Sequence, residues 1–266
     1  MTRDGDAGVD LDADRAIMAF IRESRRTRDL PHVGSFALLF TDMTHLRFLN
    51  YAIPDDGADP DDSELEALVA AFRLAERMPR VEFLPSMAPA LEARLAAQGW
   101  AVEDRLPIMT CATRTVRALP PPAGLVIGEP ADDATLLEMA RLQHEIFDDP
   151  EPAGADTVGR LRGALRRGAH ALVARDTATH ALVGAAQSGV PAGGATEVVG
   201  VAVTPSHRRR GLAGAMVSAL ARQGLDGGLA TVFLEAVPGA DGAYGKAGFL
   251  PTSTSVHISL GRDPDA

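Results

Sequence analysis

The stretch that most constrains the fold of this chain is 196–218, TEVVGVAVTPSHRRRGLAGAMVS. An apolar run of strand composition leads into a basic turn, and the turn opens a segment of helical composition. At such a turn, the unbonded N–H groups of the first helical turn and the positive end of the helix dipole face the same point. Gly211 lets an anion approach without meeting a Cβ atom, so the segment predicts a phosphate site. It is neither a Walker loop nor a Rossmann fingerprint, because the required glycine and lysine patterns are missing.

The turn Arg208-Arg209-Arg210-Gly211-Leu212-Ala213 resembles the R/Q-x-x-G-x-G/A coenzyme A-binding signature of the GNAT superfamily of N-acetyltransferases. Some thirty residues later, Tyr244-Gly245-Lys246-Ala247-Gly248-Phe249 is similar to the Y-x-K-x-G-F segment of that family. Two motifs in the family's order and spacing identify the C-terminal part as resembling an acyl-coenzyme A-dependent N-acyltransferase.

The resemblance implies acetyl-CoA as co-substrate and no metal. In the family, the fourth strand splays from the fifth and the pantetheine arm pairs with the exposed strand edge, as an added strand would. The pyrophosphate would lie on the backbone amides of 209–214. The arginines could serve as amide donors with solvated side chains or as a clamp on the 3′-phosphate. The cofactor-binding residues implied are Val201, Ala202, Val203, Arg208, Arg209, Arg210, Gly211, Leu212, Ala213, Gly214, Tyr244 and Lys246.

The same resemblance suggests two catalytic residues. Tyr244 stands where the family most often places a general acid, and a phenol, with a pKa of about 10, can protonate a departing thiolate. Glu197, eleven residues before Arg208, matches the base of the histone acetyltransferase branch. Strand alternation would put Glu197, Val199, Val201 and Val203 on one face. As alternatives, Tyr244 could be a packing residue, and Glu197 could be solvated with an ordered water acting as the base. The resemblance also implies that the N–H of Val201 holds the thioester carbonyl.

One feature departs from the family pattern. The asparagine that the family carries before the tyrosine is replaced by Val237-Pro238-Gly239, which leaves the positioning of pantetheine partly unexplained. The histidines at 144, 170, 180 and 257 lack metal-ligand spacing such as H-E-x-x-H, so they are interpreted as ordinary surface or core residues.

The element pattern predicts an α+β fold with two lobes. Three consecutive prolines mark 119–124 as a stiff linker, and 125–262 is expected to be the catalytic domain, a GNAT fold with a mixed, mostly antiparallel sheet flanked by helices. Its last strand is expected at 255–260.

Before the linker, 1–14 reads as a disordered lead-in and 15–118 as a smaller α/β lobe. A helix is expected at 64–77, with Ser63 as its cap. Residues 81–109 faintly repeat 232–258, with Leu95 aligned to Tyr244, and no phosphate turn precedes residue 120. The lobe is therefore predicted to be a degenerate GNAT-like copy; convergence of two ordinary strand-helix-strand units is the alternative.

Charge and cysteine content limit the partners. A formal net charge of −10 argues against nucleic acid, and there is no apolar run long enough to span a membrane. A single cysteine, Cys111, fits a reducing cytoplasm and is expected to be a buried apolar group. The expected partner is a small-molecule amine, and the acidic loops 55–62 and 148–151 favour a cationic one. Two alternative functions stay open: transfer to a peptide acceptor, and a non-catalytic role as an acyl-CoA sensor or scaffold. The protein could be a monomer or a homodimer.

Overall fold

The computed structural model describes residues 11–24, 31–40, 49–236 and 239–261. The chain divides into two compact units, one made of 1–108 together with 251–266 and the other of 109–250. The boundary predicted from the sequence, at 119–124, differs from this division. Residues 11–14, predicted to belong to a disordered lead-in, instead form the start of the first helix, α1, which spans Leu11–Ser24. Residues 1–10 lie outside the described part of the chain.

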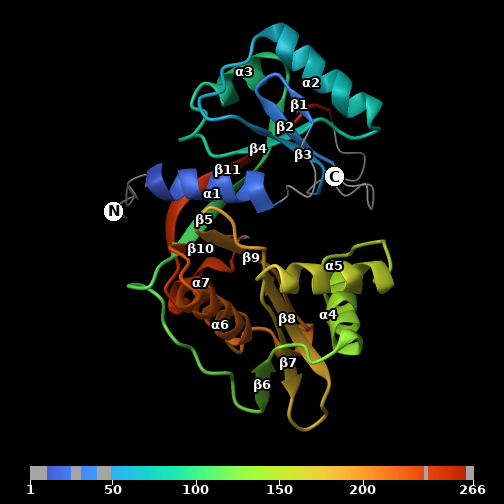
Figure 1. Ribbon diagram of the computed structural model, residues 1–266, viewed down its shortest axis with the longest axis vertical. Helices are drawn as coiled ribbons and strands as arrows, with labels where there is room; N and C mark the ends of the chain where they lie inside the picture. Colours follow the sequence, from blue (N-terminus) through green and yellow to red (C-terminus); the bar gives the residue numbers. More distant parts are fainter. Residues whose placement is uncertain (1–10, 25–30, 41–48, 237–238, 262–266) are drawn as a thin grey trace. The chain divides into compact units, whose positions relative to one another are not determined.

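The first unit is a sheet with helices packed on it (Figure 1). Strands β2 and β3 pair antiparallel, β3 and β4 pair parallel, and β4 and β11 pair antiparallel. Large apolar side chains, among them Phe36, Phe72 and Leu91, fill its core. In spatial order the strands are β1 (His32–Val33), β2 (Phe36–Leu39), β3 (Tyr51–Pro54), β4 (Arg80–Phe83), β11 (Leu250–Ser259) and β5 (Ala101–Cys111); the helices are α1, α2 (Asp62–Leu74) and α3 (Leu91–Ala97).

Helix α2 begins two residues earlier than its predicted start at 64. Asp61, not Ser63, is the N-cap, and its carboxylate accepts a hydrogen bond of 2.9 Å from the backbone N–H of Glu64. An aspartate at this position is also favoured by the positive end of the helix dipole, which explains why it serves as the cap. Leu65, Leu68 and Phe72 are buried on this helix.

The second unit has the predicted α+β fold with a mixed, mostly antiparallel sheet. The pairs β6/β7, β7/β8 and β8/β9 are antiparallel, and β9/β10 is parallel. Only residues 109–111 of β5 belong to this unit. Its remaining strands, in spatial order, are β10 (Thr231–Glu235), β9 (Ala195–Val203), β8 (Leu182–Ser188), β7 (Ala171–Asp176) and β6 (Leu125–Gly128); its helices are α4 (Asp133–Ile146), α5 (Ala155–Arg166), α6 (Leu212–Asp226) and α7 (Asp241–Ala247).

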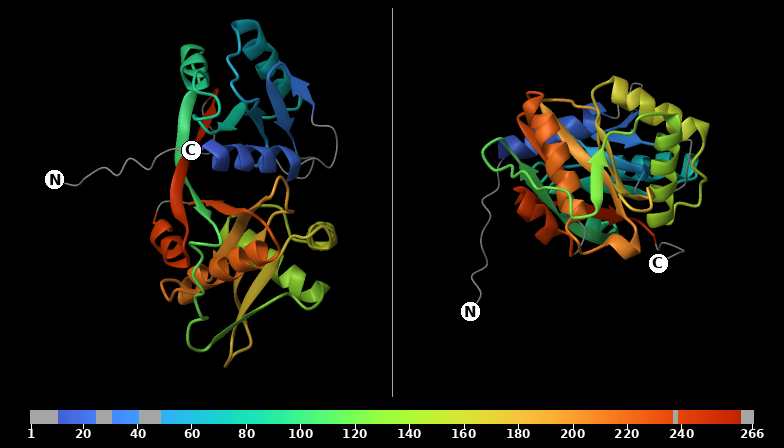
Figure 2. Two further views of the ribbon diagram at one scale, coloured as in Figure 1. Left: turned by 60° about the vertical axis from the view of Figure 1, so that its left-hand side comes forward. Right: turned by 90° about the horizontal axis from the view of Figure 1, so that it is seen from below.

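Helices cover both faces of this sheet, as the two views of Figure 2 show. On one face, Leu172 and Val203 belong to a cluster that includes buried side chains of α6 and α7. On the opposite face, Val173 and Ala202 pack with Met139 of α4. The sheet therefore has an α6 face and an α4 face.

The internal repeat is visible in the two strand-helix-strand units, β4-α3-β5 and β10-α7-β11. Each helix is followed by a left-handed glycine, Gly99 with φ 82° and Gly248 with φ 99°, and then by a buried aromatic residue. Leu95 is fully buried where the second copy has Tyr244. The last strand of the second copy, β11, was predicted to belong to the catalytic domain, but it pairs with β4 and completes the sheet of the first unit.

The proline-rich segment 119–124 is not a linker between the units, because it lies within the second one. The N–H of Leu119 donates to Ser218 Oγ at 3.0 Å, and that hydroxyl donates to the carbonyl of Arg117 at 2.6 Å. The guanidinium of Arg210 donates to the carbonyl of Ala123 at 3.0 Å. A segment stiffened by proline loses little entropy on being fixed, which suits it to serve as a strap along α6.

Across the described ranges, no helix is both long enough and apolar enough to cross a membrane.

Candidate active site

The predicted anion turn has the backbone geometry that such a site requires. A short 3-10 turn, Pro205–His207, follows β9, and Gly211, with φ 90°, is the N-cap of α6. The first bond along the helix runs from the N–H of Ala215 to the carbonyl of Gly211, at 3.0 Å. The backbone N–H groups of 212–214 therefore come before the first hydrogen bond of the helix, as those of any first helical turn do. A Cβ added at Gly211 would meet no atom within 4 Å, so the approach to the turn is open.

Two of the three arginines of this turn donate hydrogen bonds to backbone carbonyls. Arg208 Nε donates to the carbonyl of Val203 at 3.1 Å, and Arg210 donates to the carbonyl of Ala123. Arg209 has a left-handed backbone, with φ 60°. All three side chains remain exposed. The two predicted roles of the arginines, as amide donors with solvated side chains or as a clamp on a phosphate, therefore both stay predictions.

Helices α6 and α7 approach closely beside the turn. A Cβ atom at Gly214 would lie 3.0 Å from the carbonyl oxygen of Ala243, so only glycine fits there without a shift. Ala243 directly precedes Tyr244 in the chain. The close contact therefore brings the first turn of α6 and the tyrosine helix together.

Strands β9 and β10 pair over a short length only. The parallel register joins 195–197 of β9 to 231–233 of β10. In the described residues, no pairing with β10 continues along β9 from 198 to 203. The edge that includes Val201, Ala202 and Val203 therefore has no partner in β10 among the described residues.

A β-bulge interrupts β9 at Gly200. The register with β8 shifts between Ala185, which pairs with Ala202, and Gln187, which pairs with Val199. Gly200 has φ 63°. Its carbonyl accepts a hydrogen bond of 2.7 Å from Nε2 of Gln143 on α4. Glycine suits this position because the backbone is left-handed there, and a Cβ atom would also displace the side-chain nitrogen of that glutamine.

The bulge overturns the predicted alternation, which put 197, 199, 201 and 203 on one face. One extra residue in a strand reverses the side to which the following side chains point. Glu197 and Val199 therefore lie on the α4 face with Ala202, while Val203 packs on the α6 face. An interior glycine in a strand was the sequence signal for this bulge.

Tyr244 lies on α7 and is only 7% exposed. Burial raises the pKa of its phenol above the ordinary value, which keeps the hydroxyl protonated. The end of α7 is fixed by the segment after β5: the N–H of Arg117 donates to the carbonyl of Ala247 at 2.9 Å. A Cβ atom at Gly248 would overlap the carbonyl oxygen of Thr115, so that contact also depends on glycine.

The other predicted residues are less constrained. Glu197 is half-buried, and Lys246 is exposed on α7. Of the segment that replaces the family's asparagine, Val237 and Pro238 lie outside the described residues. Cys111 is buried, as predicted, and burial raises the pKa of its thiol. Among the residues that the structure describes, no group of histidine, cysteine and carboxylate side chains could hold a metal ion.

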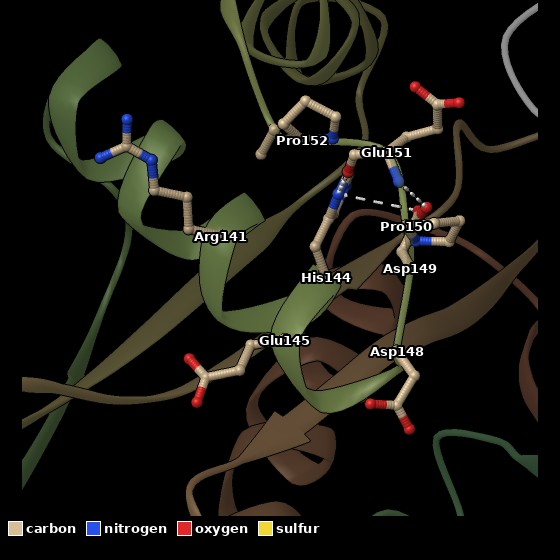
Figure 3. A pocket seen from close by; sticks show the side chains of 9 residues that line it. Arg141, His144, Glu145, Asp148, Asp149, Pro150, Glu151 and Pro152 are labelled. Atoms are coloured by element: carbon tan, nitrogen blue, oxygen red, sulfur yellow. Dashed lines mark hydrogen bonds and ion pairs between the residues drawn. The ribbon is translucent and has the colours of Figure 1, made fainter.

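An open hollow of about 640 Å³ lies at the end of α4 (Figure 3). His144 and Asp149 point toward one another there, with Nδ1 and Oδ2 3.7 Å apart, and His144 Nδ1 lies 2.6 Å from the carbonyl of Glu151. Acidic side chains outnumber the single arginine on its walls. The lining residues are Arg141, His144, Glu145, Asp148, Asp149, Pro150, Glu151, Pro152 and Ala153.

Comparison with known proteins finds a family whose model matches part of this chain. Residues 136–249 match the acetyltransferase (GNAT) family. A GCN5-related N-acetyltransferase from Kribbella flavida has a similar structure, with a TM-score of 0.75 and 25% identity over 94% of this chain and 96% of that one. No curated protein was found that matches the chain by sequence.

Two further solved structures are similar in fold. A GCN5-related N-acetyltransferase from Sphaerobacter thermophilus has a TM-score of 0.62 and 18% identity, covering 86% of this chain and 78% of that one. A tandem GNAT protein from the clavulanic acid biosynthesis pathway has a TM-score of 0.58 and 18% identity, covering 86% and 79%.

Proposed function

We propose that this chain is an enzyme of the GNAT superfamily and that it transfers an acetyl group from acetyl-CoA directly to an amine of a small molecule. The observation that carries the proposal is that two features occur next to each other in the second unit. The anion turn before α6 follows directly after the strand edge of β9 that β10 leaves unpaired. A phosphate end and an extended amide arm are the two parts of coenzyme A that these features suit.

The residues of the chain fit the cofactor without a metal. The amides of 209–214 would bind the pyrophosphate, and the edge at 201–203 would pair with the pantetheine amides. Acetyl-CoA supplies the activated thioester. The exposed turn and the open space beside Gly211 leave room for phosphate oxygens.

Two side chains are suited to the proton transfers. Tyr244, whose pKa is raised by burial, holds its proton at neutral pH and can give it to a leaving thiolate. Glu197 and Val201 lie on opposite sides of the bulge along β9. On the α4 face, Glu197 can take a proton from the amine or orient the amine. The N–H of Val201, within the bulge, is the candidate donor to the thioester carbonyl.

The hollow at the end of α4 supports a cationic acceptor better than the other acidic loop does. In 55–62, Asp56 pairs with an arginine of α1 at 2.6 Å, Asp59 pairs with an arginine of α3 at 2.8 Å, and residue 61 caps α2. These three carboxylates therefore already have partners within the first unit. By contrast, Glu145, Asp148 and Glu151 line an open space in the unit that carries the anion turn.

A thiol-release assay tests the proposal. Purified protein is mixed with acetyl-CoA and a panel of amines: spermidine, kanamycin, phenethylamine and a short lysine peptide. Thiol release that requires both protein and amine is expected, with a small amine preferred over the peptide. Tight binding of coenzyme A without turnover of any amine would instead favour a non-catalytic sensor.

A further inference from the structure

The strand next to the bulge carries a polar side chain that the proposed chemistry does not yet use. Gln187 lies on β8, where it pairs with Ala171 of β7 on one side and Val199 of β9 on the other. It follows Ala185 by two residues, so it shares the α4 face with Ala185. Figure 1 shows β8 lying between β7 and β9 in the second unit.

The carboxamide oxygen of Gln187 is buried, and no group among the described residues donates a hydrogen bond to it. A buried amide oxygen without a donor is unfavourable, because it has lost water and gained nothing in return. Gln143, on the facing helix, makes its bond to Gly200. The lack of a partner is therefore particular to Gln187 in this pair of neighbouring glutamines.

Gln187 lies beside strand residues to which the proposed function gives a role. Its Cγ lies 3.8 Å from the position of a Cβ atom at Gly200, which places it beside the bulge. Glu197 is diagonal to it on the same face, with Cβ atoms about 7 Å apart in such a pair. Two acceptor side chains that are diagonal neighbours on one face suit one ligand group that carries at least two N–H donors.

We propose that the carboxamide oxygen of Gln187 accepts a hydrogen bond from the amine acceptor and makes the site selective for primary amines. A primary amine can give one N–H to Gln187 and another toward Glu197. A neutral secondary amine has only one N–H to give. This inference rests on the proposed function, and it concerns the binding of the acceptor, not of coenzyme A.

The test is Gln187→Met, which keeps the length of the side chain and removes the hydrogen-bonding groups. We expect the KM for the best primary amine of the panel to rise at least about tenfold, which corresponds to about 1.4 kcal/mol. The KM for acetyl-CoA should stay within about twofold, and the melting temperature should not fall, because the oxygen that is removed has no partner among the described residues. The preference for the primary amine over its N-methyl derivative should shrink.

Gln223→Met is the matched control. Gln223 also has a buried carboxamide oxygen without a partner in the described part of the chain, but it lies on α6, and its Nε2 donates to Glu129 at 3.0 Å. The control should leave the KM for the amine unchanged. Gln187→Asn, which withdraws the oxygen by one methylene, should also raise that KM and serves if the methionine variant does not fold.

Three results would overturn the inference. An unchanged KM for the amine in both Gln187 variants would show that the oxygen does not touch the acceptor. A lower melting temperature with both KM values raised would show a structural role. A wild-type protein that acetylates no amine of the panel would reject the proposed function itself, and this inference with it.

Discussion

Replacing Gly248 by alanine tests how the tyrosine helix is held. Gly248 has φ 99°, and a Cβ atom there would overlap the carbonyl oxygen of Thr115. A left-handed conformation costs a residue with a Cβ atom about 1–2 kcal/mol. The segment must also move, which weakens the 2.9 Å bond from Arg117 to Ala247, a loss of about 1 kcal/mol.

The expected destabilisation of Gly248→Ala is therefore about 2–3 kcal/mol. It is measured by urea unfolding followed by far-UV circular dichroism. Gly245→Ala is the control, because it lies in the same helix with nothing within 4 Å of its Cβ position, and alanine there should stabilise by about 0.5–1 kcal/mol. If the two variants unfold at the same urea concentration, the contact with Thr115 does not constrain α7.

The remaining predictions concern the proposed site residues and the buried cysteine. Gly211→Asp places a carboxylate at the anion turn, so the affinity for coenzyme A measured by calorimetry should fall more than about tenfold; equal affinity would show that the phosphate site has been misplaced. Tyr244→Phe should lower turnover by about 10²–10⁴-fold without changing that affinity, and near-full turnover would make Tyr244 a packing residue. Because burial raises the pKa of Tyr244, the neutral phenol stabilises the folded state below about pH 10 and this contribution is lost as the pH rises further, so the Phe variant should lose less stability in that range. Glu197→Gln should lower turnover least at high pH, where the amine is already deprotonated; the same loss at every pH would assign Glu197 to orientation. Cys111, buried and with a raised pKa, should react with iodoacetamide at about pH 8 only after unfolding, and rapid labelling of the folded protein would contradict its burial.

The anion turn could be predicted from sequence because its geometry is local. A basic turn with Gly211 before an apolar helical segment fixes the position of the helix N-terminus within one residue. The same holds for α7, which ends at a left-handed glycine before Phe249. In both cases the sequence signal and the structure depend on the same few neighbouring residues.

Features that depend on distant partners were predicted less well. The proline-rich segment 119–124 reads as a linker until its bonds to Ser218 and Arg210 are known. The face of Glu197 depends on the register between β8 and β9, which alternation along β9 alone does not contain. Gln187 became a candidate only because burial left its oxygen without a partner among the described residues.

The position of β11 has a consequence for how the protein forms during synthesis. The first unit needs residues 251–259 to complete its sheet, and these follow the whole of the second unit in the chain. At about 5–20 residues per second, the ribosome takes roughly 7–30 s to make the intervening segment of about 140 residues. Throughout that interval the edge of β4 lacks its final partner, so the N-terminal unit, although made first, is the last to be completed.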